Sequence, residues 1–382
     1  MSTIKVTNIE HENTTNGGIQ LDSSGHVTVD GQQLPTSGAL SHRNLVINGD
    51  MRAAQRSTSE TGVGGAFVYT TVDRFMLRNT GTTTARYTNT QSTDAPDSFG
   101  YSYKLETTTA KGTLSATNYQ GVSTRLEGQN LQNLGYGTNS SKYLTLSFWV
   151  KSSTTGQYSC HFSNWNGGRN ISKTYTINSA NTWEQKSITI PGDSTAIAND
   201  NALGMEIGWV LASGSFYNDG TDGSTWHNTS DSGKRHSGQS VEFGGTIGDT
   251  WYLTGVQLEV GEKATPFEHR SYGDELARCQ RYFVALHDPP LRGVFGTTTV
   301  VNRCVTSLPT TMRQNPTYTT TGTYDIYDGA SIGTVTTFSA SYTTTNSVEF
   351  DATVASGTYT AGNPACFYVH TSTNQLNVDA EL

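Results

Sequence analysis

The stretch from Trp251 to Phe283 reads WYLTGVQLEVGEKATPFEHRSYGDELARCQRYF, and it joins a strand pattern, a turn and a capped helix. Every second residue from Tyr252 to Val260 falls on one face of an extended chain, while Leu253 and Gln257 fall on the other. This alternation predicts a strand with one buried side.

A turn and a helix are expected after this strand. Gly261 and Pro266 end the extended run, because the proline ring fixes φ and removes a backbone donor. Ser271, with Asp274 three residues later, matches a helix capping box. The helix is expected from Asp274 to Phe283, with one apolar face made by Leu276, Cys279 and Phe283.

The composition is that of a β-rich chain. Of the 382 residues, 15% are charged and 40 are Gly, whereas ordinary globular proteins have about 25% charged residues. Thr, Tyr, Val and Phe, which suit the half-buried surface of a sheet, are frequent, and polar helix formers are scarce outside the predicted helix. We expect an all-β protein with one short helix at most.

Charge and hydropathy argue against two kinds of partner. The formal net charge is −8 and no dense Lys/Arg cluster occurs, so nucleic-acid binding is not expected. A membrane span needs about 18 consecutive apolar residues, and no apolar run in the sequence approaches that length. The first residues, MSTIKVTN, are polar and do not resemble a secretion signal. The cysteines lack C-x-x-C spacing, which indicates buried thiols made in a reducing cytosol: Cys160, Cys279, Cys304 and Cys366.

Residues 1–43 are polar and contain short apolar pairs separated by glycines, namely Ile4 and Val6, Ile19 and Leu21, and Val27 and Val29. Each pair predicts a short strand. The apolar stripe is too narrow to form a core within one chain. Burial against identical chains, which would give a trimeric β stem, is one interpretation, and a disordered arm is the alternative.

Residues 44–270 contain several alternating strands joined by Gly, Asn and Asp turns. In one of them Leu144, Leu146, Phe148 and Val150 face the same way. Two packed antiparallel sheets in a jelly-roll β-sandwich are expected, with a barrel as the alternative. Residues 271–285 hold the helix and the start of a linker. Residues 286–382, rich in Thr and Tyr, predict a smaller C-terminal β domain.

Three pieces of sequence resemble tail fibre or receptor-binding proteins of tailed bacteriophages. They are NLVINGDMRAAQR from Asn44, the stretch from Trp251 to Phe283, and LPTTMRQNP from Leu308 with the terminal DAEL. The resemblance implies that residues 1–43 attach to the phage tail or to a virion adaptor protein. It also implies a sandwich that resembles carbohydrate-binding modules and a fibre of three chains, and it transfers no catalytic residues.

The loop from Tyr217 to Trp226 places Asp219 and Asp222 beside glycines. Oxygen-rich turns of this kind can hold Ca²⁺, but a glutamate at EF-hand spacing is missing. An exposed β-turn is therefore the favoured interpretation, and a Ca²⁺ site is the alternative. The nearby histidines match no zinc spacing: His161, His227 and His236.

Aromatic side chains near Gly-, Asn- and Ser-rich loops suit glycan recognition, because a ring can stack on a sugar while amides and carboxylates bond its hydroxyls. The candidate glycan-binding residues are Trp226, Tyr217, Asp219, Asp222, Trp165 and Tyr158. Core packing is the alternative for each single aromatic residue. The hypothesis predicts that Trp226→Ala reduces adsorption to host cells and leaves assembly intact.

Glycan hydrolysis would require two carboxylates about 5 to 10 Å apart, one of them with a raised pKa. Asp94 with Asp97, and Glu127, are the candidates, and they lie in polar turns without a local sign of burial. We therefore expect a protein that is not an enzyme, with a polysaccharide depolymerase as an alternative.

These observations together predict a homotrimeric virion protein, made in the host cytoplasm, that acts as a tail fibre. Its expected partner is a host cell-surface polysaccharide, bound during adsorption. Three weak sugar contacts on one stem would combine into high avidity. A purely structural capsid fibre, collar or adaptor component is the alternative.

Overall fold

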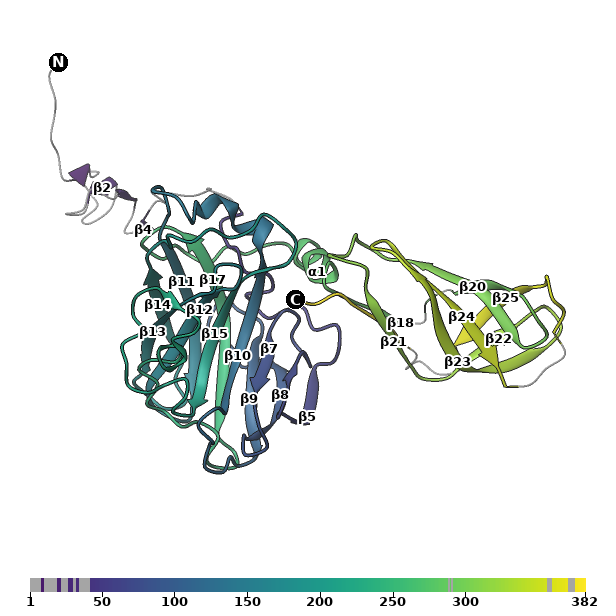
Figure 1. Cartoon of the computed structure of the whole chain (residues 1–382), viewed down its shortest axis with the longest axis horizontal. Coiled ribbons are helices and arrows are strands. Elements are labelled where there is room, and N and C mark those ends of the chain that lie inside the picture. The colour runs from purple at the N-terminus through teal and green to yellow at the C-terminus, as the bar shows by residue number, and fades with distance from the viewer. Residues whose placement is uncertain are drawn as a thin grey trace, which may run out of the picture. The chain divides into compact units, whose positions relative to one another are not determined.

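The computed structural model describes residues 8–9, 19–21, 27–29, 32–33, 42–287, 289, 291–355, 359–369 and 375–382. The chain divides into two compact units (Figure 1). Unit 1 comprises Met1–Arg52, Ser59–Thr70 and Phe75–Arg270, and unit 2 comprises Ala53–Thr58, Thr71–Arg74 and Ser271–Leu382. Within the described ranges, none of the helices has the length and apolar character needed to cross a membrane.

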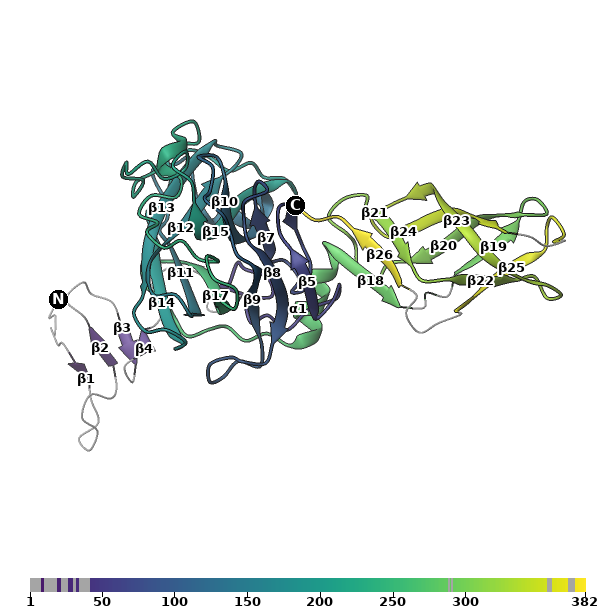
Figure 2. The ribbon, with the colours of Figure 1, turned by 90° about the horizontal axis from the view of Figure 1, so that it is seen from below.

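Unit 1 is a sandwich of two antiparallel sheets, seen as two layers in Figure 2. The seven-stranded sheet has the order β16 (His227–Asn228), β13 (Arg169–Ile177), β12 (Gly156–Asn164), β15 (Leu203–Ser213), β10 (Tyr119–Glu127), β7 (Met76–Asn79), β6 (Phe67–Val68). The six-stranded sheet has the order β14 (Glu184–Ile190), β11 (Leu144–Ser152), β17 (Thr250–Val260), β9 (Ser102–Thr109), β8 (Arg86–Ser92), β5 (Ser59–Val63). Two 3-10 helices, η1 (Gly128–Leu134) and η2 (Ser232–Lys234), lie in the connections between these strands.

The core of unit 1 lies between the two sheets. The predicted alternation of β11 is confirmed, because Leu144, Leu146, Phe148 and Val150 are all fully buried. The ring of Phe148 meets that of Trp209, on β15 of the other sheet, edge to face at a centroid distance of 5.7 Å. Full burial of one such side chain contributes roughly 1.5 to 3 kcal/mol, so the facing apolar rows hold the layers together.

The prediction that alternate residues from Tyr252 to Val260 share one face is wrong. In β17 a bulge interrupts the pairing with β11, and Gly255 takes a left-handed φ of 61°. The extra residue reverses the alternation. Leu253 therefore faces the core before the bulge, opposite Val150, whereas after the bulge Leu258 and Val260 face it, opposite Leu146 and Leu144.

The segment that begins at Asn44 lies along β17, so two of the three pieces used for the resemblance are neighbours in space. The Leu45 amide donates to the Leu258 carbonyl at 2.9 Å, and the Val256 amide donates to the Gly49 carbonyl at 2.9 Å. The Asn44 side chain accepts from the Leu258 amide at 3.1 Å. These bonds continue the sheet along the edge of β17, beyond residues 250–253, which pair with β9.

Four short strands near the N-terminus form an antiparallel sheet of their own: β1 (Asn8–Ile9), β2 (Ile19–Leu21), β3 (Val27–Val29) and β4 (Gln32–Gln33). Ile19 pairs with Val29, and Leu21 pairs with Val27. The strands expected at these two apolar pairs are confirmed. The pair Ile4 and Val6 lies outside the described residues, and assembly into a trimer stays a prediction.

The predicted capping box is present at the start of α1 (Tyr272–Gln280). The Ser271 hydroxyl accepts from the Asp274 amide at 3.2 Å and donates to the Asp274 carboxylate at 2.7 Å. The helix ends earlier than predicted, because Phe283 begins strand β18 (Phe283–His287) and pairs there with Asp379. Phe283 is buried through tertiary pairing and is not part of the helix face.

Unit 2 contains a three-stranded sheet and a closed barrel. The sheet has the order β18, β26 (Gln375–Asp379), β21 (Thr317–Thr321). The barrel has the order β19 (Arg292–Phe295), β20 (Val300–Ser307), β24 (Ser347–Val354), β23 (Ile332–Thr343), β22 (Tyr324–Tyr327), β25 (Pro364–Val369). Its core includes the fully buried side chains of Val301, Ile326, Val348 and Phe350. The all-β class, with a smaller β unit after the sandwich, is confirmed.

Two segments from early in the sequence belong to unit 2 and complete its ion-pair network. The Arg56 guanidinium lies 3.5 Å from the ring centroid of Phe283 and 3.1 Å from the Asp379 carboxylate. The Arg74 guanidinium lies 3.5 Å from the ring centroid of Tyr282 and forms an ion pair with Glu381. The C-terminal Asp-Ala-Glu-Leu segment is therefore held by charge and stacking.

Candidate functional site

The outer face of the seven-stranded sheet carries an unusual set of side chains. Directly paired residues of neighbouring strands point to the same side, so one row runs through Ser172, His161, Gly208, Ser123 and Met76. The next row contains Asn170, Ser163, Glu206 and Arg125. Along these strands the residues of the two rows alternate with residues that face the core. The strand register therefore places the buried carboxylate of Glu206 on the outer face.

Glu206 on β15 lies at the centre of this face with no exposed surface. Its carboxylate accepts from Arg125 Nε on β10 at 2.9 Å and forms an ion pair with Arg78 on β7. The Arg235 guanidinium, which follows η2, lies 3.6 Å away, and His161 Nε2 on β12 lies 3.4 Å away. We call Glu206 and the three arginines the arginine floor.

Two histidines lie beside the arginine floor, and both are held neutral. Burial, followed by the charges of Arg235 and Arg78, lowers the pKa of His236 well below its usual value. The pKa of His161 is lowered in the same way, by burial first and then by Arg235. Arg78 stays charged at neutral pH, because burial lowers its pKa only to about 10. The floor is therefore a site of positive potential.

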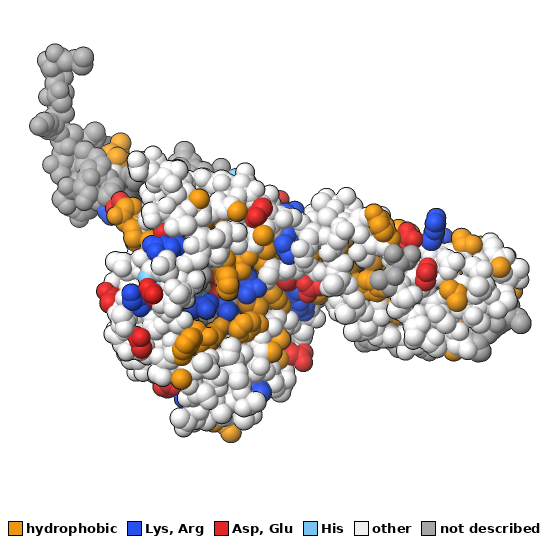
Figure 3. Space-filling view, viewed as in Figure 1, with side chains coloured by type: hydrophobic (Ala, Val, Ile, Leu, Met, Phe, Trp, Pro, Cys, Tyr) orange, Lys and Arg blue, Asp and Glu red, His pale blue; other side chains and the backbone are white. Residues whose placement is uncertain are grey.

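Aromatic side chains surround the arginine floor. Phe67 is 44% exposed, Trp165 42% and Phe216 47%, and these three with the partly exposed Tyr217 are called the aromatic rim. The Arg78 guanidinium lies 4.4 Å from the Phe67 ring centroid, and the Arg235 guanidinium lies 6.0 Å from that of Trp165. Figure 3 shows hydrophobic and Lys/Arg side chains gathered over β15, β10 and β7.

The rim is linked to the floor by Tyr119, a nearly buried residue of β10. Its hydroxyl accepts from Arg78 at 2.6 Å, and its ring meets Tyr217 edge to face at a centroid distance of 5.1 Å. Tyr217 in turn contacts Phe216 at 5.0 Å. These edge-to-face contacts limit the rotamers of Tyr217 and Phe216, so this part of the rim presents preformed ring faces.

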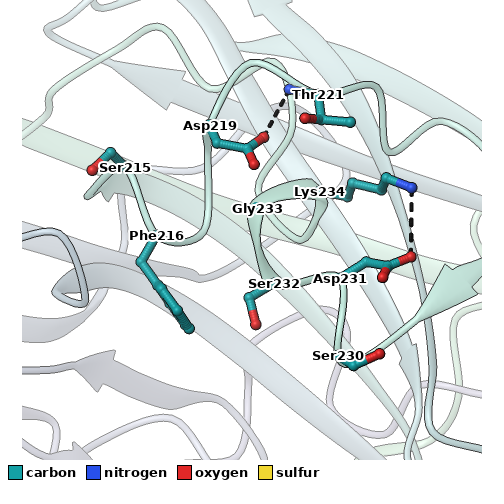
Figure 4. Close-up of a pocket in the computed structure, with 9 residues that line it drawn as sticks. All are labelled: Ser215, Phe216, Asp219, Thr221, Ser230, Asp231, Ser232, Gly233 and Lys234. Atoms are coloured by element: carbon teal, nitrogen blue, oxygen red, sulfur yellow. Dashed lines mark hydrogen bonds and ion pairs between the residues drawn. The ribbon is translucent and has the colours of Figure 1, made fainter.

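A pocket of about 540 Å³ opens in the loops next to the rim (Figure 4). Phe216 lines it, together with polar groups from Ser215, Asp219, Thr221, Ser230, Asp231, Ser232, Gly233 and Lys234. Lys234 lies 3.4 Å from Asp231, and Asp219 accepts from the Thr221 amide at 2.8 Å. An aromatic wall with hydroxyls, carboxylates and an ammonium group is chemistry suited to a sugar ring.

Three of the six predicted glycan-binding residues lie at this site. Tyr217 and Trp165 belong to the aromatic rim, and Asp219 lines the pocket. Asp222 is exposed on the same loop, but its carboxylate accepts from the Ser224 amide at 2.8 Å and does not line the pocket. The predicted loop therefore lies at one edge of the candidate site, and glycan binding by its residues stays a prediction.

The other two predicted residues are placed elsewhere. Tyr158 is not in a loop but in β12, fully buried, with its ring stacked on Tyr175 at 5.5 Å. Trp226 is half-buried, donates from Nε1 to the Pro191 carbonyl at 2.8 Å and packs edge to face on Tyr136. Both aromatic residues stabilise the fold, since their rings contact protein groups.

The sequence prediction missed the arginine floor and two residues of the rim, Phe67 and Phe216. One signal was present for Glu206. It is the single charged residue in the otherwise apolar or small strand LGMEIGWVLAS. A charge at such a position requires a partner once it is buried, but the partners come from three other segments that the sequence does not connect.

The predicted acidic turn shows no metal cluster. Among the residues that the structure describes, no three His, Cys, Asp or Glu side chains are grouped so that they could hold a metal ion. Asp219 and Asp222 each bond the backbone of their own turn. This matches the β-turn interpretation, in which the carboxylates organise the loop.

Comparisons with known proteins give similarity of fold only. No family model and no curated protein sequence matches the chain. A tailspike protein 4 enzymatically active domain of bacteriophage CBA120 is 16% identical, with a TM-score of 0.30, over 57% of this chain and 21% of that chain. This chain thus spans about a fifth of the tailspike domain's length.

Two further solved structures resemble the sandwich. A putative sugar binding protein from Bacteroides thetaiotaomicron is 10% identical, with a TM-score of 0.32, over 57% of this chain and 100% of that chain. A family 11 carbohydrate-binding module from Clostridium thermocellum, in complex with a mixed-linked tetrasaccharide, is 14% identical, with a TM-score of 0.27. The match covers 56% of this chain and 99% of that chain. At these low TM-scores the similarities identify neither the ligand nor the activity of this chain.

Proposed function

We propose that this protein binds a glycan of a host cell surface through the aromatic rim and the adjoining pocket of unit 1. The observation that carries the proposal is the placement of three exposed aromatic side chains, Phe67, Trp165 and Phe216, around a polar floor. Exposed clustered aromatic residues are costly in water and often mark a binding surface. Ring faces can stack on sugar rings while neighbouring polar groups bond the hydroxyls.

The proposed role is binding without hydrolysis. Glu206 is fully buried among guanidinium groups, so it does not reach a glycosidic oxygen. Asp94 is exposed, and hydrogen bonds from Lys151 and Trp183 outweigh its slight desolvation and lower its pKa, whereas a general acid needs a raised pKa. Glu127 is fully buried and accepts from Gln129. These environments favour a binding protein over a depolymerase.

The setting that we propose is a bacteriophage tail fibre made of three chains. Support comes from the sequence resemblance of the segments at Asn44, Trp251 and Leu308, the first two of which contact each other along β17. A trimer would present three copies of the rim, so that weak sugar contacts add to high avidity. Light scattering on the purified full chain tests this assembly, and a stable folded monomer would contradict it.

The binding proposal is tested with Trp165→Ala and Phe216→Ala in the full chain. Tyr143→Ala is the matched control, since Tyr143 is an equally exposed aromatic residue, 44%, that precedes the six-stranded sheet. We expect each rim variant to weaken binding to host cells by about ten-fold, and the control to bind as the wild type does. Equal binding by all four proteins would show that the rim is not the glycan site.

Enzymatic activity is tested separately. Purified protein is incubated with the host polysaccharide, and the release of reducing ends is measured over time. A binding protein releases none. Release of reducing ends would contradict the proposed role and support the depolymerase alternative. Adsorption that is unaffected by the rim variants, together with location on the capsid or collar by electron microscopy, would instead favour a purely structural component.

A further inference from the structure

The arginine floor places three guanidiniums around one buried carboxylate. The guanidiniums of Arg78, Arg125 and Arg235 all face the single carboxylate of Glu206. Burial lowers the pKa of Arg78, and the charges of Arg235 and Arg125 lower it further, so the guanidiniums repel one another. Both adjacent histidines are neutral. A positive site in a chain of net charge −8 is a local feature of this face.

Part of the hydrogen-bonding capacity of the floor is also unused. The buried Nε atoms of Arg78 and Arg235 have no hydrogen-bond partner within the described structure, and the same holds for Nδ1 of His161 and Nε2 of His236. Arg78, His161 and His236 are each at least nine-tenths buried. Buried polar groups in folded proteins are nearly always paired, so unpaired ones grouped at one place indicate a ligand position.

The accessible part of the floor lies at Arg125 and Arg235. Each keeps 16% of its side chain exposed, whereas Arg78 keeps 5% and Glu206 none. The Arg235 guanidinium lies within about 6 Å of the ring centroids of both Trp165 and Tyr217. A sugar that stacks on the rim would therefore bring its ring substituents close to exposed guanidinium groups.

We infer that the arginine floor recognises the carboxylate of an acidic sugar, so that the glycan bound by this protein is a uronate-type or other carboxylated polysaccharide. This inference rests on the proposed glycan-binding function. Glu206 shows that the guanidiniums accommodate a carboxylate, and a planar guanidinium matches a carboxylate with two parallel donors. A neutral sugar would offer these guanidiniums no anionic partner.

A microarray of bacterial surface polysaccharides tests the inference. Each acidic polymer, including polymers of glucuronate and galacturonate, is printed in native form and with its carboxylates reduced to primary alcohols, beside neutral and phosphorylated polymers. The wild-type chain is expected to bind native acidic polymers at least about ten-fold more tightly than their reduced forms. This difference should shrink as salt concentration rises, because ions screen partly exposed charges.

The variants Arg235→Gln and Arg235→Lys locate the effect. Arg235→Gln is expected to remove most of the preference for the native polymer, and Arg235→Lys, which keeps the charge and loses the planar fork, to retain part of it. Lys104→Gln is the control, because Lys104 lies on the six-stranded sheet and pairs with the exposed Glu106. Thermal unfolding shows whether each variant is folded. The comparison of native with reduced polymers uses the wild-type chain alone, so it holds even if a variant fails to fold.

Each outcome is decisive. Equal binding to native and reduced polymers, or binding confined to neutral or phosphorylated polymers, would overturn the carboxylate inference and leave glycan binding in place. Binding to no polymer on the array, combined with unchanged host-cell binding by the rim variants, would overturn the proposed function itself. A native-over-reduced preference that disappears in Arg235→Gln and persists in Lys104→Gln would support the inference.

Discussion

Arg125 on β10 and Glu206 on β15 form an ion pair across neighbouring strands, with Arg125 Nε 2.9 Å from Glu206 Oε2. The two residues are direct partners in the strand register. The carboxylate is fully buried and also contacts Arg78 and His161. Removal of a carboxylate from such a site leaves buried cations without compensation, which is far more costly than loss of a surface pair.

We therefore expect Glu206→Gln to lower the free energy of unfolding by about 3 to 5 kcal/mol, because the floor arginines then repel one another. Glu106→Gln is the matched control, since Glu106 is 45% exposed and pairs with Lys104. The control should change stability by less than about 1 kcal/mol. Urea denaturation measures both values, and equal losses would contradict a buried, highly coupled Glu206.

Gly255→Ala is expected to destabilise unit 1 by about 2 kcal/mol or more. Gly255 has a φ of 61°, and an added Cβ would lie 2.8 Å from Phe99 Cζ and 2.9 Å from Trp149 Cδ1. Strain in the left-handed region and the clash both oppose the folded state. Gly100→Ala is the control, because a Cβ added there would meet no heavy atom within 4 Å and the φ of Gly100 is not positive. Similar thermal stabilities of the two variants would show that the bulge in β17 does not require Gly255.

Trp226→Ala and Phe216→Ala should separate stability from binding. Trp226 donates to the Pro191 carbonyl and packs on Tyr136, so its loss should cost about 1 to 3 kcal/mol of stability. Phe216 is 47% exposed at the pocket, so its loss should weaken glycan binding and leave stability nearly unchanged. Denaturation and host-cell binding are measured for each variant. Strong loss of binding by a fully stable Trp226→Ala would instead support a glycan contact at Trp226.

Asp73 in unit 2 should make stability depend on pH. Burial raises its pKa from 3.8 to about 6, although Arg56 and Gln55 oppose the shift. The folded form therefore holds the proton more tightly than the unfolded form. This contribution to stability is fully present below pH 3.8 and is lost as the pH rises through about 6.

The comparison between wild type and Asp73→Asn isolates this effect. Relative to the variant, the wild type should be more stable at acidic pH than at pH 7, by on the order of 3 kcal/mol for a shift of this size. Denaturation at several pH values between about 4 and 7 gives the difference at each point, and contributions of other carboxylates cancel. A difference that rises with pH, or that does not change, would contradict the raised pKa.

Elements with strong local signals were predictable from the sequence. The β11 alternation, the Ser271 capping box and the short strands at Ile19 and Val27 all follow from side-chain periodicity or from a bond between near neighbours. Errors occurred where a tertiary contact outweighed the pattern. Gly255 reversed the alternation of β17 through a bulge, and Phe283 joined a strand whose partner, Asp379, lies far along the chain.

The amino-acid sequence by itself determined the β-rich class and the capped helix, because composition, propensity and capping act over a few residues. It also indicated Tyr217, Trp165 and Asp219 as binding candidates through their loop context. Only the tertiary structure brought Arg78, Arg125 and Arg235 onto Glu206, since strand order and register decide which distant side chains meet on one face. The charge and the ring faces of the site therefore depend on long-range strand pairing, which local sequence does not encode.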